Sequence, residues 1–292
     1  RHLNSQIQDF AMKYQAWLPL AVAIEPLDAL VSFQSALTAV QQTPYQLYLL
    51  IDEYDNFANQ VLMGHGLVHQ PQQYQNLVSG EGVLKTVFSA VKAASAGRGL
   101  DKVFITGVSP LVMSDITSGY NVAKNIYLEP ELNDLCGFTA AEVKTTVVQL
   151  VKDCQLSAET TSQIVLMMQT FYNGYRFSRE EATSLVYNPT LALYFWEYFQ
   201  TRCRSPGKML DSNLAMDKNK LVYLASLPQG TPIIRDALLG TSPLMINELS
   251  DRFSLTDLLK PNPDRSFMVS LLYYFGVLTL VGQTPLQELL FA

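Results

Sequence analysis

Charge and cysteine are both scarce in this sequence of 292 residues. Only 16% of the residues are charged, against roughly 25% in an average soluble protein, and the net charge is −6. No run rich in Lys or Arg occurs, and phosphate binding needs clustered positive charge, so we expect no direct nucleic-acid binding. The three cysteines, Cys136, Cys154 and Cys203, form no C-x-x-C pair. We therefore expect neither a disulfide framework nor a zinc knuckle, and we expect a cytoplasmic, reducing compartment.

Long apolar runs are also missing. A membrane span needs roughly 20 consecutive apolar residues. The most apolar stretch, residues 267–282, is interrupted by Ser270, Gly276 and Thr279, and it predicts a buried helix followed by a strand. The first residues do not combine a basic region with an apolar one, so we expect no signal peptide. With 48% apolar residues, the sequence predicts a globular protein with a large core and no membrane segment.

The first third of the chain has the pattern of a parallel sheet. Residues 47–51 and 102–106 are apolar runs, and residues 83–94 between them carry apolar side chains at helical spacing. Earlier helices are expected near residues 4–18 and 27–41. Strand, crossover helix and strand form a βαβ unit, which favours an α/β fold. Because the apolar runs do not alternate with polar residues, we expect strands buried on both faces.

Helix signals dominate after about residue 130. Thr139 and Glu142 form a capping box, with Phe138 and Val143 as its hydrophobic staple. Further helices are predicted over residues 158–172, 188–199 and 213–226, and Gly174 is expected to end the first of these in the left-handed conformation. We therefore expect two regions: residues 1–137, a sheet-based core, and residues 138–292, a mainly helical lid.

The first apolar strand ends in Asp52-Glu53, which is the form of a Walker B element. A buried strand holds the first carboxylate rigidly, so that Asp52 can orient the hydration shell of Mg²⁺. Glu53 can then accept a proton from an attacking water. The alternative is a core strand that runs into an acidic turn.

The second strand ends in Thr106-Gly107. In AAA-type ATPases the strand beside Walker B ends in a polar residue, called sensor 1, that contacts the γ-phosphate. Thr106 fits this role. The alternative is a β-branched residue that closes a strand.

Five motifs follow one another along the chain: LIDEYD (50–55), FITGVS (104–109), CGFT (136–139), YNGYRF (172–177) and VYNP (186–189). In this order they closely resemble the bacterial AAA-ATPase-like family, P-loop proteins often joined to a C-terminal PD-(D/E)XK nuclease-like domain. The resemblance extends from about residue 45 to residue 280. It implies ATP and Mg²⁺ as ligands and an effector domain or partner protein. It also makes Arg176 a candidate sensor-like arginine, with a structural or surface salt bridge as the alternative.

The sequence departs from this family at the phosphate-binding loop. Family members carry Arg-Phe-Gly-Lys-Ser upstream, whereas the one Gly-Lys pair here, Gly207-Lys208, is followed by Met209. We therefore expect part of an AAA-like P-loop ATPase, truncated at both ends and inactive alone. Joined to an upstream phosphate loop, it would hydrolyse ATP and gate an effector. The alternatives are a natural relic without nucleotide binding and a non-catalytic protein-interaction module.

Two weaker features remain. His65 and His69 have the spacing of zinc ligands on a helix, but neighbouring glycines and Pro71 argue against that helix. Residues 114–121 are rich in loop formers just beyond the second strand, where α/β proteins bind ligands, so a substrate or interdomain contact there is as plausible as an ordinary turn.

Overall fold

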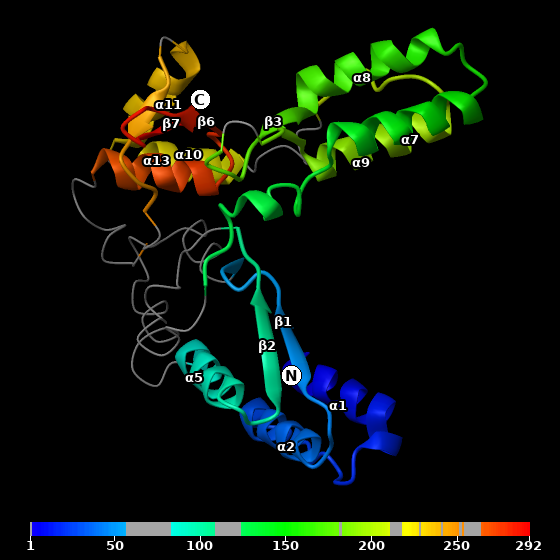
Figure 1. Cartoon of the computed structure of the whole chain (residues 1–292), viewed down its shortest axis with the longest axis vertical. Coiled ribbons are helices and arrows are strands. Elements are labelled where there is room, and N and C mark those ends of the chain that lie inside the picture. Colours follow the sequence, from blue (N-terminus) through cyan, green and yellow to red (C-terminus); the bar gives the residue numbers. More distant parts are fainter. Residues whose placement is uncertain are drawn as a thin grey trace. The chain divides into compact units, whose positions relative to one another are not determined.

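The computed structural model shown in Figure 1 describes residues 2–56, 83–108, 124–180, 183–210, 218–227, 229–240, 242–250, 253 and 264–292. The chain forms two compact units, each with its own core. The first comprises Arg1–Ala123 and Arg252–Leu258, and the second Lys124–Asp251 and Leu259–Ala292. The expected mixed α/β character is confirmed. The functional division into a core (1–137) and a lid (138–292) stays a prediction. His65, His69 and residues 114–121 lie outside the described residues.

The first unit contains the predicted βαβ arrangement. Its elements are α1 (His2–Tyr14), η1 (Gln15–Trp17), α2 (Ala29–Gln41), β1 (Leu47–Ile51), α5 (Val83–Ser95) and β2 (Leu100–Ile105). The two strands pair in parallel, and α5 packs against both β2 and α2. Helix α2 begins where the Asp28 carboxylate accepts the backbone N–H groups of Leu30 and Val31. The local signals of the sequence therefore fix the boundaries of this unit closely.

The expectation that both faces of these strands are buried is wrong. Tyr48 is 67% exposed, Leu50 74% and Phe104 40%, while the alternate residues of both strands are half-buried. Within the described residues this sheet has two strands, and one of its faces remains open to solvent. A continuous apolar run shows that both faces suit an apolar neighbour, but it does not show that both have one.

The second unit begins with η2 (Pro130–Leu132) and continues with a three-helix bundle, α7 (Ala140–Asp153), α8 (Glu159–Tyr172) and α9 (Pro189–Arg202), which lie side by side in Figure 1. The predicted capping box is confirmed, because the Thr139 hydroxyl accepts the Glu142 N–H while the Glu142 carboxylate accepts the Thr139 N–H. Asn188 caps α9, and Pro189 is its first residue. The bundle core is aliphatic on α7, whereas α8 contributes Tyr172 and α9 contributes Phe195 and Phe199.

A short antiparallel pair adjoins this bundle. Strand β3 (Asn173–Tyr175) pairs with β4 (Val186–Tyr187), and Phe138 forms a single bridge to Tyr187. The predicted left-handed cap at Gly174 is wrong: α8 ends in the extended residue Asn173, and Gly174 lies inside β3 at φ +133°. This φ still favours glycine, because a side chain is strained there.

The rest of the second unit is a small α+β part. It comprises α10 (Lys218–Ser226), α11 (Gly230–Leu239), β5 (Leu244–Ile246), α13 (Arg265–Tyr274), β6 (Leu280–Gln283) and β7 (Leu289–Phe291). The three strands form an antiparallel sheet in the order β5-β7-β6. The helix and strand predicted from residues 267–282 are confirmed as α13 and β6. Among the described residues, no helix combines the length and apolarity of a membrane span.

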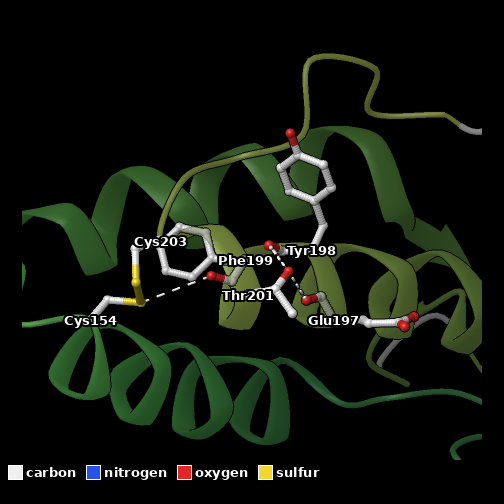
Figure 2. Close-up of a disulfide and its surroundings, with 6 residues drawn as sticks. All are labelled: Cys154, Glu197, Tyr198, Phe199, Thr201 and Cys203. Carbon is white, nitrogen blue, oxygen red and sulfur yellow. Dashed lines mark hydrogen bonds between the residues drawn. A yellow bond between two sulfur atoms is a disulfide. The ribbon is translucent and has the colours of Figure 1, made fainter.

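The expected absence of a disulfide is also wrong. Cys154 and Cys203 form one across 49 residues of sequence, with their Cα atoms 5.5 Å apart. Both are the C-cap residues of their helices, α7 and α9, which contact each other in the bundle. Figure 2 shows the bridge between the two helix ends, with one sulfur 3.9 Å from the carbonyl oxygen of Phe199. Cys136 is free and exposed.

Candidate functional site

The candidate site lies where β1 and β2 end side by side in the first unit. The strands pair in register up to Ile51 and Ile105. Beyond that pair, the Thr106 N–H donates to the Ile51 carbonyl at 2.8 Å, and the Tyr54 N–H donates to the Thr106 carbonyl at 3.1 Å. These bonds carry the alignment past both strand ends. Asp52 and Thr106 are consequently brought together, although 54 residues of sequence separate them.

The Asp52 carboxylate joins the two strand tips. Its Oδ1 accepts hydrogen bonds from the Thr106 hydroxyl and, at 2.9 Å, from the Glu53 N–H. By the alternation of strands, Asp52 and Thr106 continue the open face that carries Leu50 and Phe104. Within the described residues, Oδ2 of Asp52 makes no hydrogen bond. One carboxylate oxygen thus fixes the side chain, and the other is available to a ligand.

Glu53 follows in an uncommon backbone conformation. Its φ is +51°, the left-handed region that few non-glycine residues adopt. Asn56 holds this turn with two hydrogen bonds, one from its N–H to the Glu53 carbonyl at 3.0 Å and one from its side-chain amide to Oε2 at 2.9 Å. Glu53 is exposed. The turn therefore presents a second carboxylate to solvent directly beside Asp52.

Asp55 lies in the turn after β1 and Gly107 in the segment after β2, and neither was expected from the sequence to have a role. The Asp55 side chain is only 1% exposed, and its Oδ1 accepts the Val108 N–H at 3.1 Å. Gly107 lies close against it, because a Cβ atom at this position would be 2.6 Å from that same oxygen. Burial and the neighbouring Asp55 raise the pKa of Tyr54 well above its usual range, so its hydroxyl stays neutral. The sequence carried a signal for each residue, because Asp55 lies in the LIDEYD motif and Gly107 in the FITGVS motif.

These side chains fit a hydrated magnesium ion better than a directly coordinated metal. Mg²⁺ in nucleotide sites keeps several of its waters and needs one or two carboxylates together with phosphate oxygens. Within the described residues Asp52 keeps one carboxylate oxygen without a hydrogen bond, and Thr106 orients that carboxylate. Across the part of the chain that the structure describes, no three His, Cys, Asp or Glu side chains gather as metal ligands.

Arg176 belongs to the second unit. Its guanidinium donates to the Val281 carbonyl on β6 at 2.9 Å, and its own carbonyl accepts the Tyr273 hydroxyl at 3.5 Å. The Nε atom is buried and has no hydrogen-bond partner among the residues that the structure describes. The structure thus connects the YNGYRF motif to the C-terminal sheet, while the sensor role of Arg176 stays a prediction.

One comparison with known proteins gave a match. Residues 1–117 match the model of the AAA-ATPase-like family, described as predicted AAA-ATPase. The match contains β1, β2 and the four residues Asp52, Glu53, Thr106 and Asp55. The motifs at 136–189 lie beyond it. No curated protein and no solved structure matched the chain. Over residues 1–117, therefore, the chain is similar to predicted AAA-ATPases.

Proposed function

We propose that the first unit supplies the magnesium-orienting and water-activating side chains of an AAA-like P-loop ATPase. One observation carries the proposal: Asp52 and Thr106 are hydrogen-bonded at the adjoining tips of two parallel strands, with Glu53 next in the chain. This arrangement lies wholly within the segment that matches predicted AAA-ATPases.

Each side chain then has a distinct task. Mg²⁺-ATP, when bound, supplies the phosphoryl group that is transferred to water. Asp52 would orient the waters of the metal ion through Oδ2, while Thr106 keeps Oδ1 in place. Glu53 would accept the proton of the attacking water on a carboxylate oxygen. Arg176 stays a candidate sensor-like arginine.

The nucleotide phosphates need hydrogen-bond donors, which P-loop ATPases supply chiefly from one loop. The sequence contains no G-x-x-x-x-G-K-[ST] segment, whose backbone N–H groups and lysine hold the β- and γ-phosphates. The proposed activity therefore requires a phosphate-binding loop joined to this sequence. For the 292-residue chain alone we expect no measurable ATP binding, which isothermal calorimetry with Mg²⁺-ATP would check.

Residues 138–292, most of which belong to the second unit, are proposed as a helical lid that transmits the nucleotide state to a nuclease-like domain or another partner. The separate core of the second unit supports this, since a compact unit can move as one body. We also propose a cytoplasmic location. The Cys154–Cys203 disulfide does not support that location, and a fully oxidised bridge in protein from intact cells would argue against it.

The test compares three variants in a protein that joins this sequence to its phosphate loop. Glu53→Gln should keep ATP affinity but slow single-turnover hydrolysis, because general-base assistance is worth about 10²–10⁴-fold. Asp52→Ala should weaken both Mg²⁺-ATP binding and turnover. Thr106→Ala should slow turnover with little loss of affinity.

Asp101→Asn is a suitable control, because this exposed carboxylate is at the opposite end of β2. Hydrolysis at the unmodified rate by Glu53→Gln would show that Glu53 is not the base. If none of the three variants differs from the control, the strand-tip assignment is wrong. The second candidate, a non-catalytic interaction module, would then be favoured, and the open apolar face of β1 and β2 supports that function.

A further inference from the structure

We propose that Asp55 is a positioning residue, whose buried carboxylate holds residues 106–108 against the end of β1 and so aims the Thr106 hydroxyl at Asp52. The juxtaposition itself rests on the structure alone. Its consequence for hydrolysis rests on the proposed function.

The segment beyond β2 is held at three successive residues. The Thr106 carbonyl accepts the Tyr54 N–H at 3.1 Å, Gly107 lies against the Tyr54 ring, and the Val108 N–H donates to Asp55 Oδ1 at 3.1 Å. All three contacts come from the turn that follows Asp52. The turn after β1 therefore holds the segment after β2 by hydrogen bonds and packing, beyond the point where the strands pair.

Burial makes the Asp55 contact strong. The side chain is 1% exposed, so it cannot exchange the Val108 N–H for bulk water without opening the turn. A buried carboxylate is costly unless hydrogen bonds satisfy it, and a bond to an ionised acceptor is worth roughly twice a neutral one. Removing the acceptor would also leave the Val108 N–H without this partner.

The close approach of Gly107 to Asp55 supports the same positioning role on steric grounds. A Cβ atom there would be 2.6 Å from Asp55 Oδ1 and would overlap the Tyr54 ring. Tyr54 and Asp55 thus approach residue 107 so closely that only glycine fits there without displacing them. Thr106 immediately precedes Gly107, so lifting residue 107 would move the Thr106 hydroxyl away from Asp52.

The first experiment uses the 292-residue chain and needs no ATPase activity. Hydrogen exchange measured by mass spectrometry at dilute concentration would follow the peptide containing residues 104–108. Asp55→Ala should accelerate exchange there by about tenfold or more, because the Val108 N–H loses its buried acceptor. Asp55→Asn keeps an acceptor oxygen and should restore most of the protection, and Asp101→Asn should have no effect.

Gly107→Ala provides a second variant that leaves every carboxylate intact. It should accelerate exchange in the same peptide, and its exchange rate remains interpretable if Asp55→Ala fails to fold. If this exchange is unchanged in both Gly107→Ala and Asp55→Ala, the positioning role is overturned, whatever the protein does with ATP.

The second experiment uses the protein that includes the phosphate loop. Asp55→Ala should slow single-turnover hydrolysis by about 10- to 100-fold, the size of effect that a small misplacement of a catalytic group can have, with less than about threefold change in the ATP Kd. Asp55→Asn should recover most of the rate. Normal hydrolysis despite accelerated exchange would overturn the inference. If the wild-type protein hydrolyses no ATP, the proposed function fails, and the exchange result alone supports or overturns the positioning role.

Discussion

Glu53 and Cys203 are among the described non-glycine residues that adopt the left-handed conformation. Glu53 and Cys203 both have φ of +51°. Such a conformation costs roughly 1–3 kcal/mol for a residue with a side chain and persists where the surroundings fix it. Asn56 fixes Glu53 through two hydrogen bonds, and the disulfide fixes Cys203. In the first case the result is an exposed carboxylate held beside Asp52.

Thr139→Ala should lower the stability of the second unit at neutral pH by about 1 kcal/mol, the usual effect of losing a threonine N-cap. Hydrogen bonds from the Thr139 N–H and hydroxyl lower the pKa of Glu142. A lowered folded-state pKa contributes stability above the unfolded pKa, and this contribution is lost as the pH falls through the lowered value. The effect of Thr139→Ala on urea unfolding should therefore be largest at neutral pH and shrink in acid.

Thr145→Ala is the matched control, because Thr145 is exposed on the same helix and bonds back to the Ala141 carbonyl. Its effect should be small and independent of pH. A Thr139→Ala effect of equal size at neutral and acid pH would show that the hydrogen bond from the Thr139 hydroxyl to the Glu142 carboxylate contributes nothing.

Among the secondary structure elements, those with strong local signals were predictable. Strand β1 matches the predicted residues 47–51, and α7 begins at its predicted cap, because apolar runs and capping residues act over a few positions. The meeting of Asp52 and Thr106 was predictable too, since parallel strands end at one edge of a sheet. The burial of Asp55 was not, because it depends on a glycine that lies far along the chain.

The disulfide and the strand faces were missed for the same physical reason. Cys154 and Cys203 become neighbours only when α7 and α9 pack together, and no sequence pattern near either cysteine specifies that packing. Likewise, Leu50 has the residue type of a core position, but its exposure depends on which elements cover the sheet. The partner of Arg176, a carbonyl of β6, is also set by tertiary packing.

Reducing the disulfide should destabilise the three-helix bundle. In the chain-entropy model, a bridge between cysteines 49 positions apart in the sequence contributes about 4 kcal/mol. Cys203→Ser should therefore lower the unfolding midpoint of the second unit, and dithiothreitol should lower it in the wild-type protein by a similar amount. Calorimetry with and without the reductant measures both effects.

Cys136→Ser is the control, because Cys136 is free and exposed. It should change neither the midpoint nor its response to dithiothreitol. Equal midpoints for oxidised and reduced wild-type protein would contradict a stabilising bridge, and alkylation followed by peptide mass spectrometry would establish whether the bridge forms in solution.

At the scale of the whole molecule, the open sheet face of the first unit is expected to govern solution behaviour. Tyr48, Leu50 and Phe104 line up across β1 and β2, and contiguous apolar surface of this kind promotes association. A two-stranded sheet also has strand edges that can pair with another chain. We therefore expect the 292-residue chain to self-associate at high concentration.

Leu50→Thr should reduce this association without unfolding the protein. Leu50 is 74% exposed, so its replacement removes little buried surface, and threonine suits a β-strand. Light scattering after size exclusion, over a range of concentrations, should show the variant remaining monomeric where the wild type does not. Leu286→Thr is the control, since Leu286 is 83% exposed but lies in the turn between β6 and β7 of the other unit. A wild-type chain that stays monomeric throughout the concentration range would show that the open face does not promote self-association. Equal effects of the two substitutions would show that association depends on general surface apolarity and not on the face that leads to Asp52 and Thr106.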